Sequence, residues 1–159
     1  MRVGIGHAQH SFDAKRVLML GGVKVPGAWG LRGRADGDVL LQAIADALLG
    51  GAVLGDCNDH FPIEDAAWRD TPSAVLIAEV LARLQAKGLR PAHVDATLVS
   101  DRVELDPARG AMRERIASLL GLEDDRVSVK RAGTGGLGAL GDGGGMAAWT
   151  VVSLTEDAA

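Results

Sequence analysis

The sequence has no tyrosine and only five aromatic residues, two phenylalanines and three tryptophans, among 159 residues. A core with so few rings must be built from alanine, valine, leucine and isoleucine. The single cysteine, Cys57, excludes an internal disulfide framework and fits a reducing compartment. No stretch approaches the roughly 20 apolar residues that a membrane helix needs, and no apolar leader opens the chain. We therefore expect a cytoplasmic protein without a membrane partner.

Positive charge is also scarce. The chain has 17 lysines and arginines against 21 aspartates and glutamates, which gives a net charge of −4, and no basic run exceeds two residues. Proteins that bind nucleic acid normally carry a basic stripe and aromatic side chains that stack on bases. Because this sequence has neither feature, we expect no nucleic-acid partner.

The remaining composition is typical of a globular protein. Apolar residues make up 47% and charged residues 24% of the chain. A length of 159 residues suits one domain, so residues 1–159 are predicted to form a single domain. Glycine is frequent, at 22 residues, and eight of these fall within the 13 residues 133–145.

Hydrophobic periodicity and turn residues predict the order of the secondary structure. Strands are predicted at 2–10, 93–100, 126–131 and 146–154, and a hairpin at 17–25 around Gly21-Gly22. Helices are predicted from Asp36 to Gly50, from Pro72 to Lys87 and from Pro107 to Gly121, with capping residues at their ends. Loops are predicted at 26–36 and 52–71. This order fits one layer of helices on one sheet, in the α+β or α/β class.

A polar stripe on the first predicted helix is a candidate for chemistry. Asp38, Gln42 and Asp46 are spaced i, i+4 and i+8, so they share one helix face. Ala8 and His10 share one face of the first strand, and His10 would meet Asp46 if that face packs near the helix. The alternative is a solvated helix face and a surface histidine, which the pattern alone favours.

Other familiar site patterns are missing. The glycine-dense segment 133–145 lacks the ending of a P-loop, so a turn or close backbone packing explains it better than phosphate binding. The four histidines have no metal-binding spacing, and one cysteine excludes a cysteine-rich zinc site. No Gly-x-Ser-x-Gly motif supports a hydrolase.

One helix motif and several other segments match a known family in a single register. The motif runs from Asp36-Gly37-Asp38-Val39 to Asp46-Ala47-Leu48-Leu49-Gly50. The other matching segments are Arg2-Val3-Gly4, Gly21-Gly22-Val23, Leu54-Gly55-Asp56, Phe61-Pro62, Gln85-Ala86-Lys87-Gly88, Val94-Asp95-Ala96-Thr97, Met112-Arg113 and Leu137-Gly138. On these residues the chain resembles the methylerythritol cyclodiphosphate synthase family (2-C-methyl-D-erythritol 2,4-cyclodiphosphate synthase) over nearly its whole length.

The resemblance implies a fold, an assembly and a reaction. The fold is α+β, a single mixed β-sheet with helices on one face, and the assembly is a homotrimer with active sites between neighbouring subunits. The family converts a cytidine-diphospho-methylerythritol phosphate into the cyclic diphosphate and releases CMP, in non-mevalonate isoprenoid biosynthesis. One zinc ion and usually a magnesium ion assist the attack of one phosphate on another.

The positions that hold zinc in the family differ in this chain. The resemblance places the three ligands, an Asp, a His and a second His, at Ala8, His10 and Gln42. Alanine has no donor atom, and an amide is a weak zinc ligand. We therefore expect no zinc at this position and no cofactor.

Further family positions have also changed. Where the family has a His-Ser pair, this chain has Arg34-Ala35, and where the family has a lysine in the nucleotide loop, this chain has Glu104. A Thr-Thr-Thr-Glu stretch, whose hydroxyls touch the diphosphate in the family, is Ala132-Gly133-Thr134-Gly135 here. Only Thr134 is retained as a candidate for phosphate binding, and we assign no catalytic residue. Asp142 and Gly144 replace an Arg and a Glu of the central channel. Together these changes predict cyclase turnover near background.

The nucleoside side of the family site is better preserved. Asp56 stands where the family binds ribose, and the cytosine would be read by backbone groups around Ser100, Glu104 and Leu105. A cytidine nucleotide or a phosphorylated small molecule is therefore the expected ligand. Arg34 and Arg131 are new cations near the phosphate position, and the alternative for both is solvated surface.

Three functions stay open at this point. The first is a metal-free homologue without the family's cyclase activity, kept as a binding or regulatory protein. The second is different chemistry in the same pocket on a nucleotide or phosphorylated metabolite. The third is a working synthase with an unusual site.

Overall fold

The centre of the fold is an antiparallel pair of long strands, β1 (Arg2–Leu20) and β5 (Gly145–Glu156), in the computed structural model, which describes residues 1–156. The sheet order is β2-β1-β5-β3-β4, with β2 at Val23–Arg32, β3 at Leu89–Val99 and β4 at Val127–Ala132. β4 runs parallel to β3, because the helix α4 (Asp106–Leu120) joins the two strands as a crossover. The sheet is therefore mixed.

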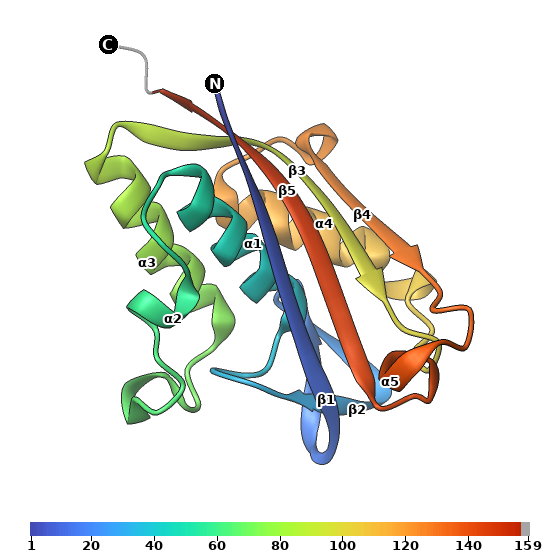
Figure 1. The fold of residues 1–159 in the computed structure, drawn as a ribbon. Helices are drawn as coiled ribbons and strands as arrows, with labels where there is room; N and C mark the ends of the chain where they lie inside the picture. The colour runs from blue at the N-terminus through green and yellow to red at the C-terminus, as the bar shows by residue number, and fades with distance from the viewer. Residues whose placement is uncertain (157–159) are drawn as a thin grey trace.

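The long helices cover one face of this sheet. Figure 1 shows α1 (Val39–Gly51), α3 (Ser73–Ala86) and α4 on the same side of the strands. Short helical turns complete the chain at α2 (Cys57–His60), η1 (Ala66–Trp68), η2 (Asp124–Arg126) and α5 (Gly138–Gly141). The predicted α+β fold, a single mixed sheet with helices on one face, is confirmed. Within residues 1–156, no helix has the length and apolar character of a membrane span.

Two glycines of β1 allow the helix α1 to lie directly on the strand. A Cβ atom at Gly4 would come 1.9 Å from the carbonyl oxygen of Ala47, and one at Gly6 would come 2.0 Å from that of Ala43. No side chain fits in either place, so the two backbones are in contact. The strand alternates as its side-chain period of two requires, because Gly4 and Gly6 are buried while Val3 and Ile5 are exposed.

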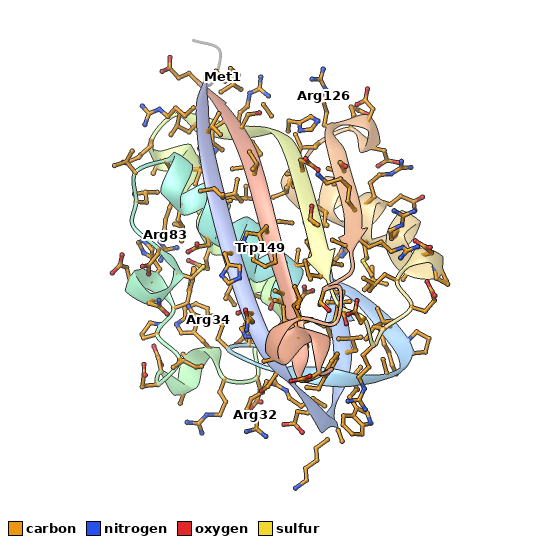
Figure 2. All side chains as sticks on the ribbon, turned by 45° about the vertical axis from the view of Figure 1, so that its right-hand side comes forward. Met1, Arg32, Arg34, Arg83, Arg126 and Trp149 are labelled. Atoms are coloured by element: carbon orange, nitrogen blue, oxygen red, sulfur yellow. The ribbon has the colours of Figure 1, made fainter. Side chains whose placement is uncertain are left out.

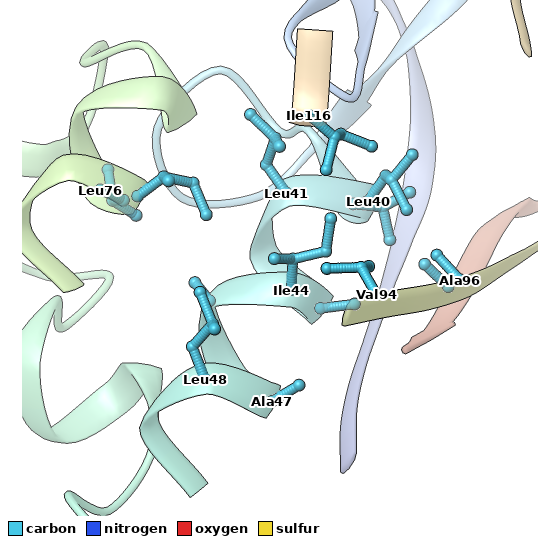
Figure 3. Close-up of a cluster of buried hydrophobic side chains, with 14 of the residues drawn as sticks. Leu40, Leu41, Ile44, Ala47, Leu48, Leu76, Val94, Ala96 and Ile116 are labelled. Atoms are coloured by element: carbon cyan, nitrogen blue, oxygen red, sulfur yellow. The ribbon is translucent and has the colours of Figure 1, made fainter. Parts of the chain in front are cut away.

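The helix α1 is the middle of the hydrophobic core. Eleven of its 13 residues are buried, so side chains leave it in almost every direction. Figure 3 shows Leu40, Ile44 and Leu48 of α1 beside Leu76 of α3, Val94 of β3 and Ile116 of α4. Aliphatic residues fill this core, as the shortage of aromatic residues predicts. At about 25 cal/mol per Å² of apolar surface, this burial is the main favourable contribution to folding.

Asp38 is buried completely at the start of α1, so the alternative of a solvated helix face is wrong. Its Oδ1 accepts from the backbone N–H groups of Leu40 and Leu41, which caps the helix. The same carboxylate accepts from the N–H groups of Gly21 and Gly22, in the turn between β1 and β2. Asp38 therefore fastens the hairpin to the helix. Burial raises the pKa of this carboxyl to about 6, against the opposing effect of these hydrogen bonds.

Several predicted boundaries are wrong for local reasons. The predicted loop 26–36 is mostly strand, because β2 continues to Arg32 in spite of its proline and glycines. The predicted loop 52–71 contains α2 and η1. β1 extends to Leu20 through irregular pairing with β2, so strand 2–10 and the first arm of the hairpin are one element. The glycine-dense segment also contains the single turn α5.

The face of the sheet away from the helices carries an apolar stripe. Ile5 of β1 pairs with Val151 of β5, and His7 pairs with Trp149, with ring centroids 4.7 Å apart. Val3, Ile5, Trp149 and Val151 are all substantially exposed. Figure 2 shows Trp149 near the middle of the strands. An exposed apolar stripe in the centre of a sheet is typical of a surface that another molecule covers.

We predict that Asp38→Asn destabilises the protein. The side-chain NH2 of asparagine would face either the N–H of Gly22 or the N–H groups at the start of α1 in place of an acceptor oxygen. Buried donors would then have no acceptor. The free energy of unfolding, measured with urea, should fall by about 1–3 kcal/mol. Asp70→Asn is the matched control at an exposed position and should have little effect. Equal stability of Asp38→Asn and wild type would contradict the role given to this carboxylate.

The raised pKa of Asp38 also predicts a dependence on pH. Because the pKa is about 6 in the folded protein and 3.8 as the ordinary value, folding favours the protonated form. The stability that this group contributes is present at low pH and is lost as the pH rises through about 6. Asp38→Asn cannot titrate, so the difference in unfolding free energy between wild type and variant should shrink as the pH is raised. A difference that grows with pH would show that the pKa is lowered instead.

Candidate active site

A cavity of about 250 Å³ opens where β1, α1 and the start of α2 meet. It is lined by His7, Ala8, His10, Arg34, Gln42, Asp46, Asp56, Cys57 and Asn58. The structure therefore brings together six of the residues singled out from the sequence, Ala8, His10, Arg34, Gln42, Asp46 and Asp56, around one cavity. His10 and Asp46 share this cavity, as the helix geometry suggested, but the direct partner of His10 is Gln42.

A hydrogen-bonded chain fixes His10 in the cavity. The Nε2 of Gln42 donates to the carbonyl oxygen of Arg34 at 2.9 Å, which sets the orientation of the amide because a carbonyl can only accept. The Oε1 of Gln42 therefore faces Nε2 of His10, at 2.9 Å, and this ring nitrogen carries the proton. Burial lowers the pKa of the His10 imidazole, although the bond to Gln42 acts in the opposite direction.

The imidazole of His10 is also confined from the other side. A Cβ atom at Gly33 would lie 2.7 Å from Nε2 of His10, so the ring packs against the bare backbone of that glycine. Nε2 is thus enclosed between Gln42 and Gly33, and it has no lone pair to offer while it donates to Gln42.

Arg34 is not solvated surface, so that alternative is wrong for this residue. Its Nη1 donates to the carbonyl oxygens of Cys57 and Phe61, at 2.6 and 2.8 Å, and its Nη2 donates to Oδ1 of Asn58 at 2.5 Å. The guanidinium closes one wall of the cavity and holds the segment of α2 against the β2–α1 connection (Figure 2). Most of its donors are therefore used within the protein.

The acidic residues of the cavity are tied to α2. Asp46 accepts from the N–H of Cys57 at 3.2 Å. Asp56 caps α2 by accepting from the N–H groups of Asn58 and Asp59, and Asp59 in turn accepts from the N–H of Asp56. This reciprocal pair is a capping box, and the Asp-x-x-Asp spacing was the sequence signal for α2 that the loop prediction missed.

Cys57 is not a nucleophile in this arrangement. The thiol is buried, and burial together with Asp46 raises its pKa to about 12. A thiol at that pKa stays protonated and unreactive at neutral pH. Its Sγ lies 3.9 Å from the carbonyl oxygen of Gln42, which makes it part of the packing behind the cavity.

A second cavity, of about 360 Å³, lies at the carboxyl ends of β3 and β4. It is lined by residues 100–105 together with Arg131 and Gly133. The predicted nucleotide residues are therefore divided, because Ser100, Glu104, Leu105 and Arg131 line this cavity whereas Asp56 lines the first. Within one chain the two groups therefore line different cavities.

The predicted phosphate-binding residues of this second region have partners inside the chain. Arg131 is half-exposed and its Nε donates to Asp106 at 3.0 Å. The N–H and hydroxyl of Thr134 both donate to the carboxylate of Asp101. These bonds hold the pKa of Asp101 below its usual value. Thr134 therefore connects the glycine-dense segment to the loop after β3.

The comparisons with known proteins agree on one family. The sequence profile of the YgbB family matches residues 1–155. Two curated relatives, the 2-C-methyl-D-erythritol 2,4-cyclodiphosphate synthases of Gloeobacter violaceus and Moorella thermoacetica, are each 46% identical over 98% of this chain and 96% of their own length. A solved structure of 2C-methyl-D-erythritol-2,4-cyclodiphosphate synthase in a form bound to CDP superposes with a TM-score of 0.88 at 32% identity, covering 97% of this chain and 100% of the other.

A second solved structure extends the same result. The bifunctional IspDF of Campylobacter jejuni superposes with a TM-score of 0.92 at 31% identity, over 98% of this chain and 42% of that longer protein. Fold and sequence thus agree on one small α+β architecture. The chain belongs to the YgbB family, the family of the 2-C-methyl-D-erythritol 2,4-cyclodiphosphate synthases.

This membership corrects the expectation that the chain uses no cofactor. The curated relatives, at 46% identity over 98% of the chain, are synthases of a family that uses a divalent metal. That expectation was based on Ala8, His10 and Gln42 alone, and the similarity of the whole chain to these synthases overturns it.

Ala8, His10 and Gln42, at the family's zinc position, nevertheless do not form a suitable set of zinc ligands. Ala8 supplies a methyl group, the Gln42 amide oxygen is occupied by His10, and Nε2 of His10 is protonated. Among residues 1–156, three or more histidine, cysteine, aspartate or glutamate side chains nowhere converge as metal ligands. Zinc prefers imidazole, thiolate and carboxylate donors. Ala8, His10 and Gln42 therefore do not supply the Asp-His-His donor set that the resemblance implies.

We predict that Arg34→Ala loosens the wall of the cavity. The carbonyl oxygens of Cys57 and Phe61 would lose their donor, and Phe61 is completely buried. The free energy of unfolding should fall by about 1–3 kcal/mol. Arg32→Ala is the matched control: its side chain is 73% exposed and its ion pair with Asp13 is 3.7 Å long, so its effect should stay below about 0.5 kcal/mol. Similar effects of the two substitutions would contradict the anchoring role of Arg34.

Proposed function

We propose that this chain carries out the reaction of its curated relatives, the conversion of a cytidine-diphospho-methylerythritol phosphate into the cyclic diphosphate with release of CMP. The observation that carries this proposal is 46% identity to named synthases over 98% of the chain. The comparisons favour this working synthase over the homologue without activity that the substituted positions suggested. The same proposal places the protein in the cytoplasm, in non-mevalonate isoprenoid biosynthesis.

The cytidine part of the substrate would be held by the better preserved residues. Asp56 uses Oδ1 to cap α2, and within residues 1–156 its Oδ2 accepts no hydrogen bond, so this oxygen is available to the ribose hydroxyls. The base would contact the backbone of residues 100–105, which line the second cavity. One structural relative is described in a form bound to CDP, which supports this choice of ligand.

The division of the site between two cavities supports a trimer. Asp56, assigned to the ribose, and the loop 100–105 line separate cavities of one chain, and we infer that the nucleotide contacts both by lying between two copies. The exposed stripe of Val3, Ile5, Trp149 and Val151 gives the copies an apolar surface to bury. A closed three-fold assembly would cover this stripe on every copy.

We predict a homotrimer in solution. Light scattering at micromolar concentration should give about three times the 16.5 kDa of one chain. Ile5→Asp, which places a charge in the centre of the stripe, should dissociate the assembly, whereas Val53→Asp, at a position equally exposed but away from the sheet, should not. A monomeric mass for wild type would contradict the shared site.

A second candidate function has its own supporting observation. The hydrogen bond between His10 and Gln42, with Ala8 beside it, occupies the place of the family's metal ligands. In addition, Gly135 stands where the family has a glutamate, so a carboxylate is lost. Glu104 stands where the family has a lysine, so a positive charge beside the diphosphate becomes negative. These residues support a protein that binds a cytidine nucleotide without converting the family's substrate.

The release of CMP from the cytidine-diphospho substrate, with zinc and magnesium added, separates the two functions. The synthase proposal predicts turnover comparable to that of ordinary family members. Background turnover together with intact binding of CDP would overturn it in favour of the second function. Loss of one well-placed electrostatic stabiliser costs about 10²–10³ in rate, so the two results differ clearly.

A double variant tests the cavity itself. Ala8→Asp with Gln42→His restores the family's ligand types around His10, and the variant should bind about one zinc per subunit. Ala82→Asp with Gln85→His makes the same changes on the exposed face of α3 and should bind none at that affinity. If wild type turns over only at background, zinc binding by the double variant without a rise in turnover would place the defect at Ala132-Gly133, where the family has threonines.

A further inference from the structure

The guanidinium of Arg102 lies between two aromatic rings. Its Cζ is 4.0 Å from the centroid of the Trp29 ring on β2 and 5.3 Å from that of the Phe12 ring on β1. Both distances fall within the roughly 6 Å at which a cation is attracted to a ring face. Within residues 1–156 no carboxylate pairs with Arg102. Its other contact is a long hydrogen bond, 3.4 Å, from Nη1 to the carbonyl oxygen of Gly143.

This contact joins the loop after β3 to the hairpin of β1 and β2. Phe12, Trp29, Arg102 and Val103 line a small space of about 110 Å³ between the loop and the hairpin. The chain has only five aromatic residues, and two of them are placed here. Trp29 is 48% exposed, so packing of the core does not explain its position.

The same loop is fastened a second time, one residue earlier. Asp101 accepts from the N–H and hydroxyl of Thr134, and the hydroxyl of Ser100 accepts from the N–H of Arg102. The loop is therefore held on one side by the glycine-dense segment and on the other by the two rings. Directly after these attachments in the chain, residues 103–105 line the second cavity.

We propose that Arg102 is a positioning residue, and that its insertion between Phe12 and Trp29 holds loop 100–105 in the shape that receives the base of a cytidine nucleotide. This inference rests on the proposed function, since it assigns that loop to the base. Arg102 need not touch the ligand. A loop that is ordered before the ligand binds loses less conformational entropy on binding. The contact of Arg102 with Phe12 and Trp29 therefore raises the affinity for the ligand.

The experiment measures CDP binding by calorimetry and amide hydrogen exchange of residues 100–105, in the full-length protein. Arg102→Ala should weaken CDP binding about tenfold and speed exchange in the loop. Arg102→Lys keeps a cation and should recover part of the affinity, and Trp29→Phe keeps a ring and should do the same. Arg126→Ala, at an exposed arginine whose ion pair with Asp125 is 3.7 Å long, is the control and should change neither readout.

A double-mutant cycle of Arg102 and Trp29 separates an effect of their contact on CDP affinity from a general loss of structure. If Arg102 acts through the ring, Trp29→Leu should weaken binding as Arg102→Ala does, and the two together should add little further loss. In the turnover assay Arg102→Ala should raise KM and leave kcat unchanged. Additive losses, or unchanged CDP affinity in Arg102→Ala, would overturn the inference.

Failure of the proposed function gives a different result. If wild type binds no CDP, the assignment of the loop to a cytidine nucleotide is wrong, and the inference falls with it whatever the exchange rates show. If wild type binds CDP and Arg102→Ala speeds loop exchange without weakening binding, the proposed function stands and the positioning role is refuted.

Discussion

The contact between α1 and β1 at Gly4 and Gly6 is the constraint on which the rest of the structure depends. Because two helix carbonyls occupy the space of the missing side chains, the helix axis lies closer to the strand than any larger residue allows. This approach brings Gln42 within 2.9 Å of His10 and opens the first cavity beside them. It also lets α1 become the buried centre against which α3, α4 and the sheet pack. The candidate site is thus a consequence of how the core is built.

Much of the fold could be predicted from the sequence because its signals are local. The caps and periodicity of α1, α3 and α4 identify each helix to within a few residues, and the alternation from Val3 to His10 identifies the faces of β1. The hairpin prediction included the start of β2, but the rest of the strand was predicted as a loop because proline and glycine are typical of loops. Pairing with β1 is a tertiary effect that the segment does not encode by itself. The burial of Asp38 was missed for a related reason, since its partners lie in a turn 16 and 17 residues away.

The site was predicted less completely, and the reasons are geometric. Helical spacing placed Gln42 and Asp46 on one face, but only the register of β1 on α1 decides that Gln42 reaches His10. Arg34 was identified as a new cation, yet its three acceptors lie in α2 and at its C-cap Phe61, within a segment that was predicted as a loop. The expectation of no cofactor gave three substituted positions more weight than relatedness over the whole chain, and family membership corrected it. Arg102 was not singled out, because its partners Phe12 and Trp29 lie on two strands that are far from it in the sequence.

The central claim is that two copies of this chain build one nucleotide site from their separate cavities. A crystal structure of the protein grown with CDP tests this claim most directly. The account predicts a trimer in which the ribose contacts Asp56 of one subunit and the cytosine lies against residues 100–105 of its neighbour. CDP held entirely within one subunit, or bound away from both cavities, would contradict it.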